Sequence, residues 1–188
     1  MENNSINNTS FPEFQPVSII ADKVFAHCKQ RECFEAVKVQ LPQEDQFEFV
    51  NITFHPGKII NGTLVITTIH NRPNFSRVRF ATRIIFDLRV KNIKTGAIIS
   101  ITKKLPDISK DIVLYIPEAR NEFEFKIDIE TASQTLTEPM EEDGYLRFAI
   151  GVYMIVKVIG KVQLLIPEFG FCPEPPDCEE FLINDACE

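Results

Sequence analysis

Cysteine is the residue type in this chain that offers the most distinctive chemistry. All five cysteines lie in two flanking stretches, with none between Cys33 and Cys172. Thiols can pair as disulfides or bind zinc, and the two uses require different spacings. The count is odd, so at least one thiol stays free or pairs between chains if the others pair within the chain. The five are Cys28, Cys33, Cys172, Cys178 and Cys187.

A zinc site is one interpretation of these flanks. It would use the thiols of Cys28, Cys33, Cys172 and Cys178, with His27 as a spare ligand. Cysteine pairs in structural zinc sites are usually separated by two to four residues, so that both sulfurs reach one ion. Here the gaps are four and five residues, and the second gap contains three prolines. The spacing favours disulfides over zinc, and five reduced, inert thiols remain the third interpretation.

Disulfides would act differently at the two ends of the chain. Cys28 and Cys33 are five positions apart, so on one strand they would face opposite ways. A bond from either one to Cys172 or Cys178 would close a loop worth about 4–5 kcal/mol in the chain-entropy model. Cys187 lies next to the last residue, where little packing can shield it. We therefore expect Cys187 to link subunits, with Cys28 or Cys33 of the next subunit as its partner.

Other residue types do not assemble into a recognisable catalytic motif. His27, His55 and His70 are dispersed, and a structural or surface role is expected for each. The sequence has no glycine-rich phosphate loop, no nucleophile elbow and no His-Glu-x-x-His pattern. Its carboxylates fall on exposed strand faces or in acidic loops. The sequence thus predicts a protein that is not an enzyme and has no cofactor or catalytic residue.

A basic strand face is the remaining candidate for binding. Between Val78 and Val90 apolar residues gather on one face and mostly polar ones on the other, which is the pattern of a β-strand. One interpretation is a face that binds a sulfated or phosphorylated polymer. The other is that this face lies beside the acidic face of residues 122–130, in the same molecule or a neighbour. Its cationic residues are Arg77, Arg79, Arg83, Arg89 and Lys91.

The elements that position these residues are all expected to be strands. A period of two dominates, no window shows a helical stripe, and a phase change near Val50 indicates a bulge. Residues 131–144 are expected to form an acidic loop, and residues 145–166 two strands divided at Gly160. Repeated short strands predict an antiparallel β-sandwich or jelly-roll-like single domain. The other expected strands are 47–54, 64–68, 78–90, 97–102, 111–116 and 122–130.

Domain organisation follows from composition. An extended, asparagine-rich arm is expected over residues 1–20, the sandwich over 21–170, and a Cys/Pro-rich tail over 171–188. The first segment of the sandwich, residues 21–45, carries Cys28 and Cys33.

With 44% hydrophobic residues, the chain of 188 residues can bury a sizeable core. The net charge of −7 argues against general nucleic-acid binding. Neither a secretory signal nor an apolar run able to span a bilayer is visible.

The cysteine-containing flanks resemble a group of spore proteins from anaerobic endospore-forming bacteria. The resemblance is carried by residues 23–25 (KVF), 28–35 (CKQRECFE) and 170–181 (GFCPEPPDCEEF). These proteins are similar to the SPOCS family, the β-rich domains of spore-coat assembly proteins. The resemblance implies a non-catalytic protein made in the mother-cell cytoplasm without a signal peptide and deposited on the spore surface. Lysis of the mother cell would then expose its thiols to oxidation.

The function expected from the sequence is structural. We expect a self-assembling protein of the spore envelope (coat, exosporium or surface appendage) whose subunits are joined by disulfides. Its partners would be further copies of itself and other coat proteins, without nucleic acid or a membrane span. The alternative is a non-catalytic β-sandwich module that recognises an anionic polymer or glycan through the arginine-rich face.

Overall fold

A computed structural model describes residues 15–42, 46–117 and 124–168 of the chain. These residues form only β-strands and their connections, so the all-β antiparallel fold expected from the alternation is confirmed. Residues 21–162 form one compact unit, which is a β-sandwich. The described residues of a second unit are 15–20 and 163–168, where the Gln163 side chain donates a hydrogen bond to Ser18 Oγ at 2.6 Å.

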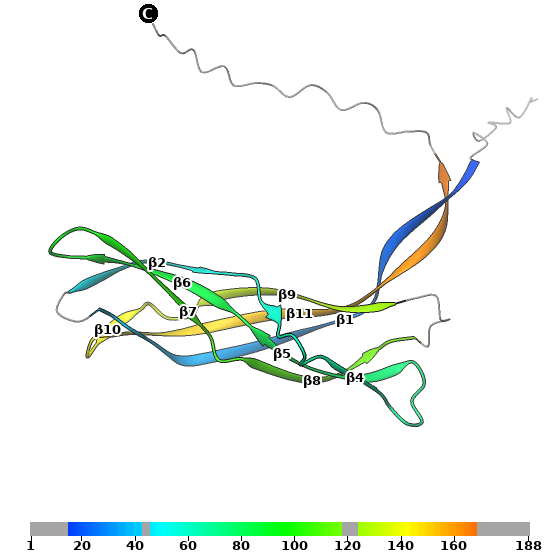
Figure 1. The fold of residues 1–188 in the computed structure, drawn as a ribbon, viewed down its shortest axis with the longest axis horizontal. Coiled ribbons are helices and arrows are strands. Elements are labelled where there is room, and N and C mark those ends of the chain that lie inside the picture. Colours follow the sequence, from blue (N-terminus) through cyan, green and yellow to red (C-terminus); the bar gives the residue numbers. More distant parts are fainter. Residues whose placement is uncertain (1–14, 43–45, 118–123, 169–188) are drawn as a thin grey trace, which may run out of the picture. The chain divides into compact units, whose positions relative to one another are not determined.

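One layer of the sandwich is built around the long strand β11 (Figure 1). β11 (Tyr145–Glu168) pairs with β1 (Gln15–Gln40) on one side. On its other side it pairs with β9 (Phe125–Thr135) and β10 (Met140–Glu142). The first segment expected from the sequence is therefore part of a single strand, β1, which already begins at Gln15.

The opposite layer consists of two sheets whose strands alternate along the chain. The first has the order β2-β6-β7, from β2 (Phe47–Phe54), β6 (Ile85–Asn92) and β7 (Ile98–Lys104). In the second, β5 (Phe75–Arg83) pairs with β3 (Lys58–Ile59), β4 (Val65–Thr68) and β8 (Ile108–Tyr115). The two layers meet in one core, where the rings of Phe86 and Phe148 lie 6.3 Å apart.

The strand expected over residues 78–90 is in fact two strands, β5 and β6, which belong to different sheets. The alternation runs through the break, because Ile84 is buried in phase with Val78 and Phe86. The hydrogen-bonding partners change at this point: Ile84 accepts from the Leu105 N–H and Ile85 from the His55 N–H, both at 2.9 Å. The side-chain pattern therefore cannot reveal the change of sheet.

The two strands expected within residues 145–166 are in fact one, because β11 continues through Gly160. Gly160 is a site of close packing. A Cβ there would lie 3.0 Å from the ring of Phe125 and 3.1 Å from that of Phe25. The centroids of these two rings are 5.1 Å apart in an edge-to-face arrangement, beside the glycine that has no side chain.

The acidic loop expected over residues 131–144 is also partly strand. β9 extends to Thr135, and β10 and β11 form a tight hairpin in which Glu142 pairs with Tyr145. Its two turn residues, Asp143 and Gly144, have φ values of 53° and 76°. Both φ values are positive, as in the type I′ turn that an Asp-Gly pair favours in two-residue hairpins.

The core is mainly aliphatic and aromatic, and no cysteine is among its fully buried side chains. Burying one such side chain contributes about 1.5–3 kcal/mol relative to leaving it exposed. The largest are Phe86, Ile84, Leu88, Leu105, Ile150 and Met154.

Candidate cross-linking and charged faces

Strand β1 presents its two cysteines to opposite sides, as their spacing predicts. Cys28 is half-buried and packs against the core, whereas Cys33 is exposed. Burial raises the pKa of the Cys28 thiol, while the nearby Lys110 cation lowers it by a smaller amount. Since the thiolate is the reactive form, Cys28 is shielded both by packing and by protonation.

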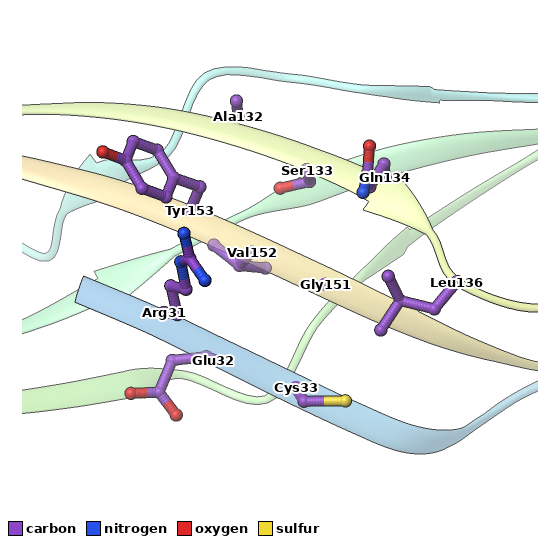
Figure 2. A pocket seen from close by; sticks show the side chains of 10 residues that line it. All are labelled: Arg31, Glu32, Cys33, Ala132, Ser133, Gln134, Leu136, Gly151, Val152 and Tyr153. Atoms are coloured by element: carbon purple, nitrogen blue, oxygen red, sulfur yellow. The ribbon is translucent and has the colours of Figure 1, made fainter. Parts of the chain in front are cut away.

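The exposed Cys33 lies beside a shallow hollow of about 580 Å³ on the outer face of β1, β11 and β9 (Figure 2). Gly151 forms part of this hollow, and a Cβ there would come within 3.0 Å of Leu136 Cδ2. Along the same face, the Arg31 guanidinium lies 6.0 Å from the ring centroid of Tyr153. Cys33 is therefore a thiol at the rim of an open, partly apolar surface.

A zinc ion cannot gather Cys28 and Cys33. Five positions of continuous strand separate their Cα atoms by roughly 16 Å, and the side chains leave on opposite faces. The same separation excludes a disulfide between them, which needs Cα atoms about 4.4–6.8 Å apart. Within residues 15–42, 46–117 and 124–168 no cluster of metal-ligating side chains is found. Cys172, Cys178 and Cys187 lie outside the described residues.

The arginine-rich face is divided between two strands. Arg77, Arg79 and Arg83 belong to β5, whereas Arg89 and Lys91 belong to β6. β5 and β6 have different neighbours, so the five cations are not one continuous row beside one partner strand.

Counter-charges for this face come from β8 and the residues just before it. Arg77 Nε donates to Asp111 Oδ1 at 2.7 Å, and its Nη2 contacts the other carboxylate oxygen. Arg83 donates to both oxygens of Asp107, at 3.0 and 2.8 Å. These hydrogen bonds raise the pKa of both guanidinium groups and lower the pKa of both carboxyls.

Within the molecule, the acidic strand expected beside the arginines is therefore not their neighbour, and contact with that strand of a neighbouring molecule stays a prediction. β9, which carries the described part of residues 122–130, pairs with β11, and its Glu130 contacts Lys157 at 2.5 Å. The face of β9 does alternate as expected, with Ile127 buried and Glu130 exposed. Two of the five cations are neutralised locally, and the described residues give Arg79, Arg89 and Lys91 no ion pair.

An acidic residue also interrupts the basic face. Asp87 accepts a hydrogen bond from Thr102 Oγ1 at 2.5 Å, and its other oxygen lies 2.7 Å from His55 Nε2. Thr102 and then His55 lower the pKa of this carboxyl. The three histidines considered from the sequence, His27, His55 and His70, are all exposed.

Sequence reasoning missed one cluster between the layers. Lys110 occupies an inward position of β8, between Ile108 and Ile112, where the alternation calls for an apolar residue. Its side chain is only 7% exposed and reaches Glu32 of β1. A lysine in phase with buried aliphatic residues was the available signal, since buried charges require partners.

Comparison with known proteins returns no match to a family model, a curated protein or a solved structure. Among the described residues there is no helix long and apolar enough to cross a membrane.

Proposed function

We propose that this chain is a structural, self-assembling protein of the bacterial spore envelope, located in the coat, the exosporium or a surface appendage. Disulfides between subunits would join its copies, and other coat proteins would be further partners. The resemblance of the cysteine-containing flanks to spore proteins similar to the SPOCS family supports the setting.

The observation that carries the proposal is the different exposure of the two described thiols. Cys28 packs against the core, and burial raises its pKa, so it is poorly placed to react with another chain. Cys33 is exposed beside the hollow on the outer face of the sandwich. An accessible thiol on a rigid strand can be docked reproducibly, as the strict geometry of disulfides requires.

Cys33 is accordingly the better partner for Cys187 of a neighbouring subunit. The sequence alone left Cys28 and Cys33 as equal alternatives. Cys28 is half-buried against the core, so it offers a partner less of its surface than the exposed Cys33.

Non-reducing electrophoresis of the full chain tests this function. Native material should give a ladder that collapses with reductant to the monomer of 21.5 kDa. Cys33→Ser should remove the ladder and Cys187→Ser should do the same, while Cys28→Ser is the matched control that retains it. A monomer band from material never exposed to a thiol would contradict the proposal.

A second function is favoured by the three cations of this face for which the described residues show no ion pair. Arg79, Arg89 and Lys91 are exposed, and a sulfated or phosphorylated polymer would offer them anionic partners. This alternative predicts salt-sensitive binding of a sulfated polysaccharide by the monomer. Changing all three to Gln should abolish that binding, whereas the exposed Lys161→Gln should not. Binding without a reducible ladder would favour this alternative over self-assembly.

A further inference from the structure

The cluster around Lys110 joins the two layers of the sandwich at one of their open sides. β1 is the outer strand of its layer, and β8 pairs with β5 alone in the layer opposite. The Lys110 ammonium nitrogen contacts Glu32 Oε1 and lies 3.5 Å from Gln30 Oε1. One amine thus touches a carboxylate and a carboxamide that β1 presents from the same face, two positions apart.

The amine itself is largely removed from water, whereas the side chain of its partner Glu32 is 38% exposed. The Lys110 side chain is 7% exposed. Cys28 occupies the next inward position of β1 before Gln30, and burial raises the pKa of its thiol. Removing an ammonium group from water is costly unless it is paired, so the folded chain holds Lys110 close to both oxygens.

We propose that Lys110 and Gln30 react to form an isopeptide bond within the chain. Lys110 Nζ attacks Gln30 Cδ, the new N–C bond forms, and the bond from Cδ to the Gln30 amide nitrogen breaks. That nitrogen leaves as ammonia. Glu32 first accepts a proton from the Lys110 ammonium group, which gives Nζ a lone pair for the attack. It delivers this proton to the leaving nitrogen and takes up the second proton, which Nζ releases as the amide forms. One ammonia is lost, and the reaction needs no oxidant and no cofactor.

The placement of the three groups is what would make a slow reaction feasible. Held in contact within one fold, an amine and an amide react at an effective concentration far above that in solution. A carboxylate in contact with the attacking nitrogen supplies proton transfer, which typically contributes 10²–10⁴-fold. Glu32 itself is a poor acceptor for the amine, because a carboxylate anion repels a nucleophile, whereas the Gln30 carboxamide is neutral.

The bond would close a side of the sandwich that no backbone ladder closes. On the opposite side the layers are already held at Gly57, whose N–H donates to Thr131 Oγ1 at 2.6 Å. A covalent link from β1 to β8 would hold the second side. This inference does not depend on the proposed function, since it concerns one chain and no thiol.

Mass spectrometry of the full chain, denatured, reduced and alkylated, tests the bond. The intact mass should be lower than the sequence mass by one ammonia molecule. Trypsin does not cleave after a modified lysine, so residues 105–120 should stay whole and carry the dipeptide Gln30-Arg31 as a branch. The full sequence mass would overturn the proposal. Loss of one water with a branch to residues 32–38 would overturn Gln30 as the acceptor.

Three variants separate the roles. Gln30→Ala keeps the Lys110–Glu32 contact and should restore the full mass, whereas Glu32→Ala should slow bond formation by roughly 10²–10⁴-fold. Lys157→Arg is the matched control, since Lys157 contacts Glu130 on another face, and it should retain the mass deficit. A deficit that survives Gln30→Ala would contradict the assignment.

Discussion

Gly57 shows how a single residue sets the approach of the two layers. It follows β2, and it has no room for a side chain because a Cβ would lie 2.8 Å from Thr131 Cγ2 and 3.1 Å from Ile84 Cγ1. We expect Gly57→Ala to lower the free energy of unfolding by about 1–3 kcal/mol through overpacking. Urea denaturation of the purified chain measures this change.

Thr131→Ser provides the control for that prediction. It removes the crowding methyl group and keeps the hydroxyl that accepts the Gly57 hydrogen bond. The double variant should therefore recover part of the stability lost in Gly57→Ala. If both single changes add without recovery, the clash with Thr131 is not the cause.

Three aspartates should make the folded chain lose stability as the pH becomes acidic. Asp87, Asp107 and Asp111 each have a pKa lowered by side-chain hydrogen bonds, from an ordinary value of 3.8. The unfolded chain binds protons more readily at these sites, so their contribution is full above that value. It is lost as the pH falls through the lower pKa values of the folded state.

The expected result is a melting temperature that falls below about pH 4 less steeply when all three are changed to Asn. Changing Arg77 and Arg83 to Gln should make this fall less steep in part, because it removes the donors to two of the carboxyls. Melting curves between about pH 2 and 7 measure both effects. Equal slopes in all variants would mean that these hydrogen bonds do not persist in solution.

At the scale of elements, residue patterns predicted which face of a strand is buried better than they predicted where a strand begins or ends. The phase change near Val50 correctly indicated a bulge, since the register of β2 and β6 shifts between Phe49 and Asn51. The boundary at Ile84 could not be predicted, because inward residues continue in phase while the neighbouring strands change. The prediction that a strand ends at Gly160 was wrong for a related reason. The sequence alone does not distinguish a glycine required by close packing from a glycine that ends a strand.

The candidate sites were predictable only where local periodicity determines them. Opposite faces for Cys28 and Cys33 follow from their spacing on one strand, and the structure agrees. The carboxylates that neutralise Arg77 and Arg83 depend on which strand pairs with β5. The sequences of the individual strands do not determine that pairing. The contact between Lys110 and Glu32 joins two layers, so only the folded chain brings it about.

The first strand supports a prediction about assembly. Residues 15–20 belong to the second unit, whereas the core cluster comes from residues 25–158. Deleting residues 1–20 should therefore leave a folded sandwich, and assembly should weaken if these residues add a strand to a neighbouring copy. Circular dichroism measures the fold and light scattering the assembly. Equal assembly of the full and shortened chains would make the arm a passive tail.

At the scale of the whole molecule, folding and cross-linking should be separable. The fully buried side chains of the sandwich include no cysteine, and Cys28 only packs against their periphery. We expect a variant with all five cysteines changed to Ser to keep a β-type circular dichroism spectrum and one cooperative unfolding transition.

The loss of stability in that variant should be modest, about 1–3 kcal/mol, and it should come from the hydroxyl placed at position 28. Replacing Cys28 by Val in the same variant should recover most of it, because Val offers an apolar surface of similar size. Calorimetry of the two variants, with electron microscopy of both, separates the fold from the assembly. A variant that unfolds without cooperativity in both versions would mean that disulfides hold the sandwich itself together, and the thiols would then be core staples instead of links between subunits.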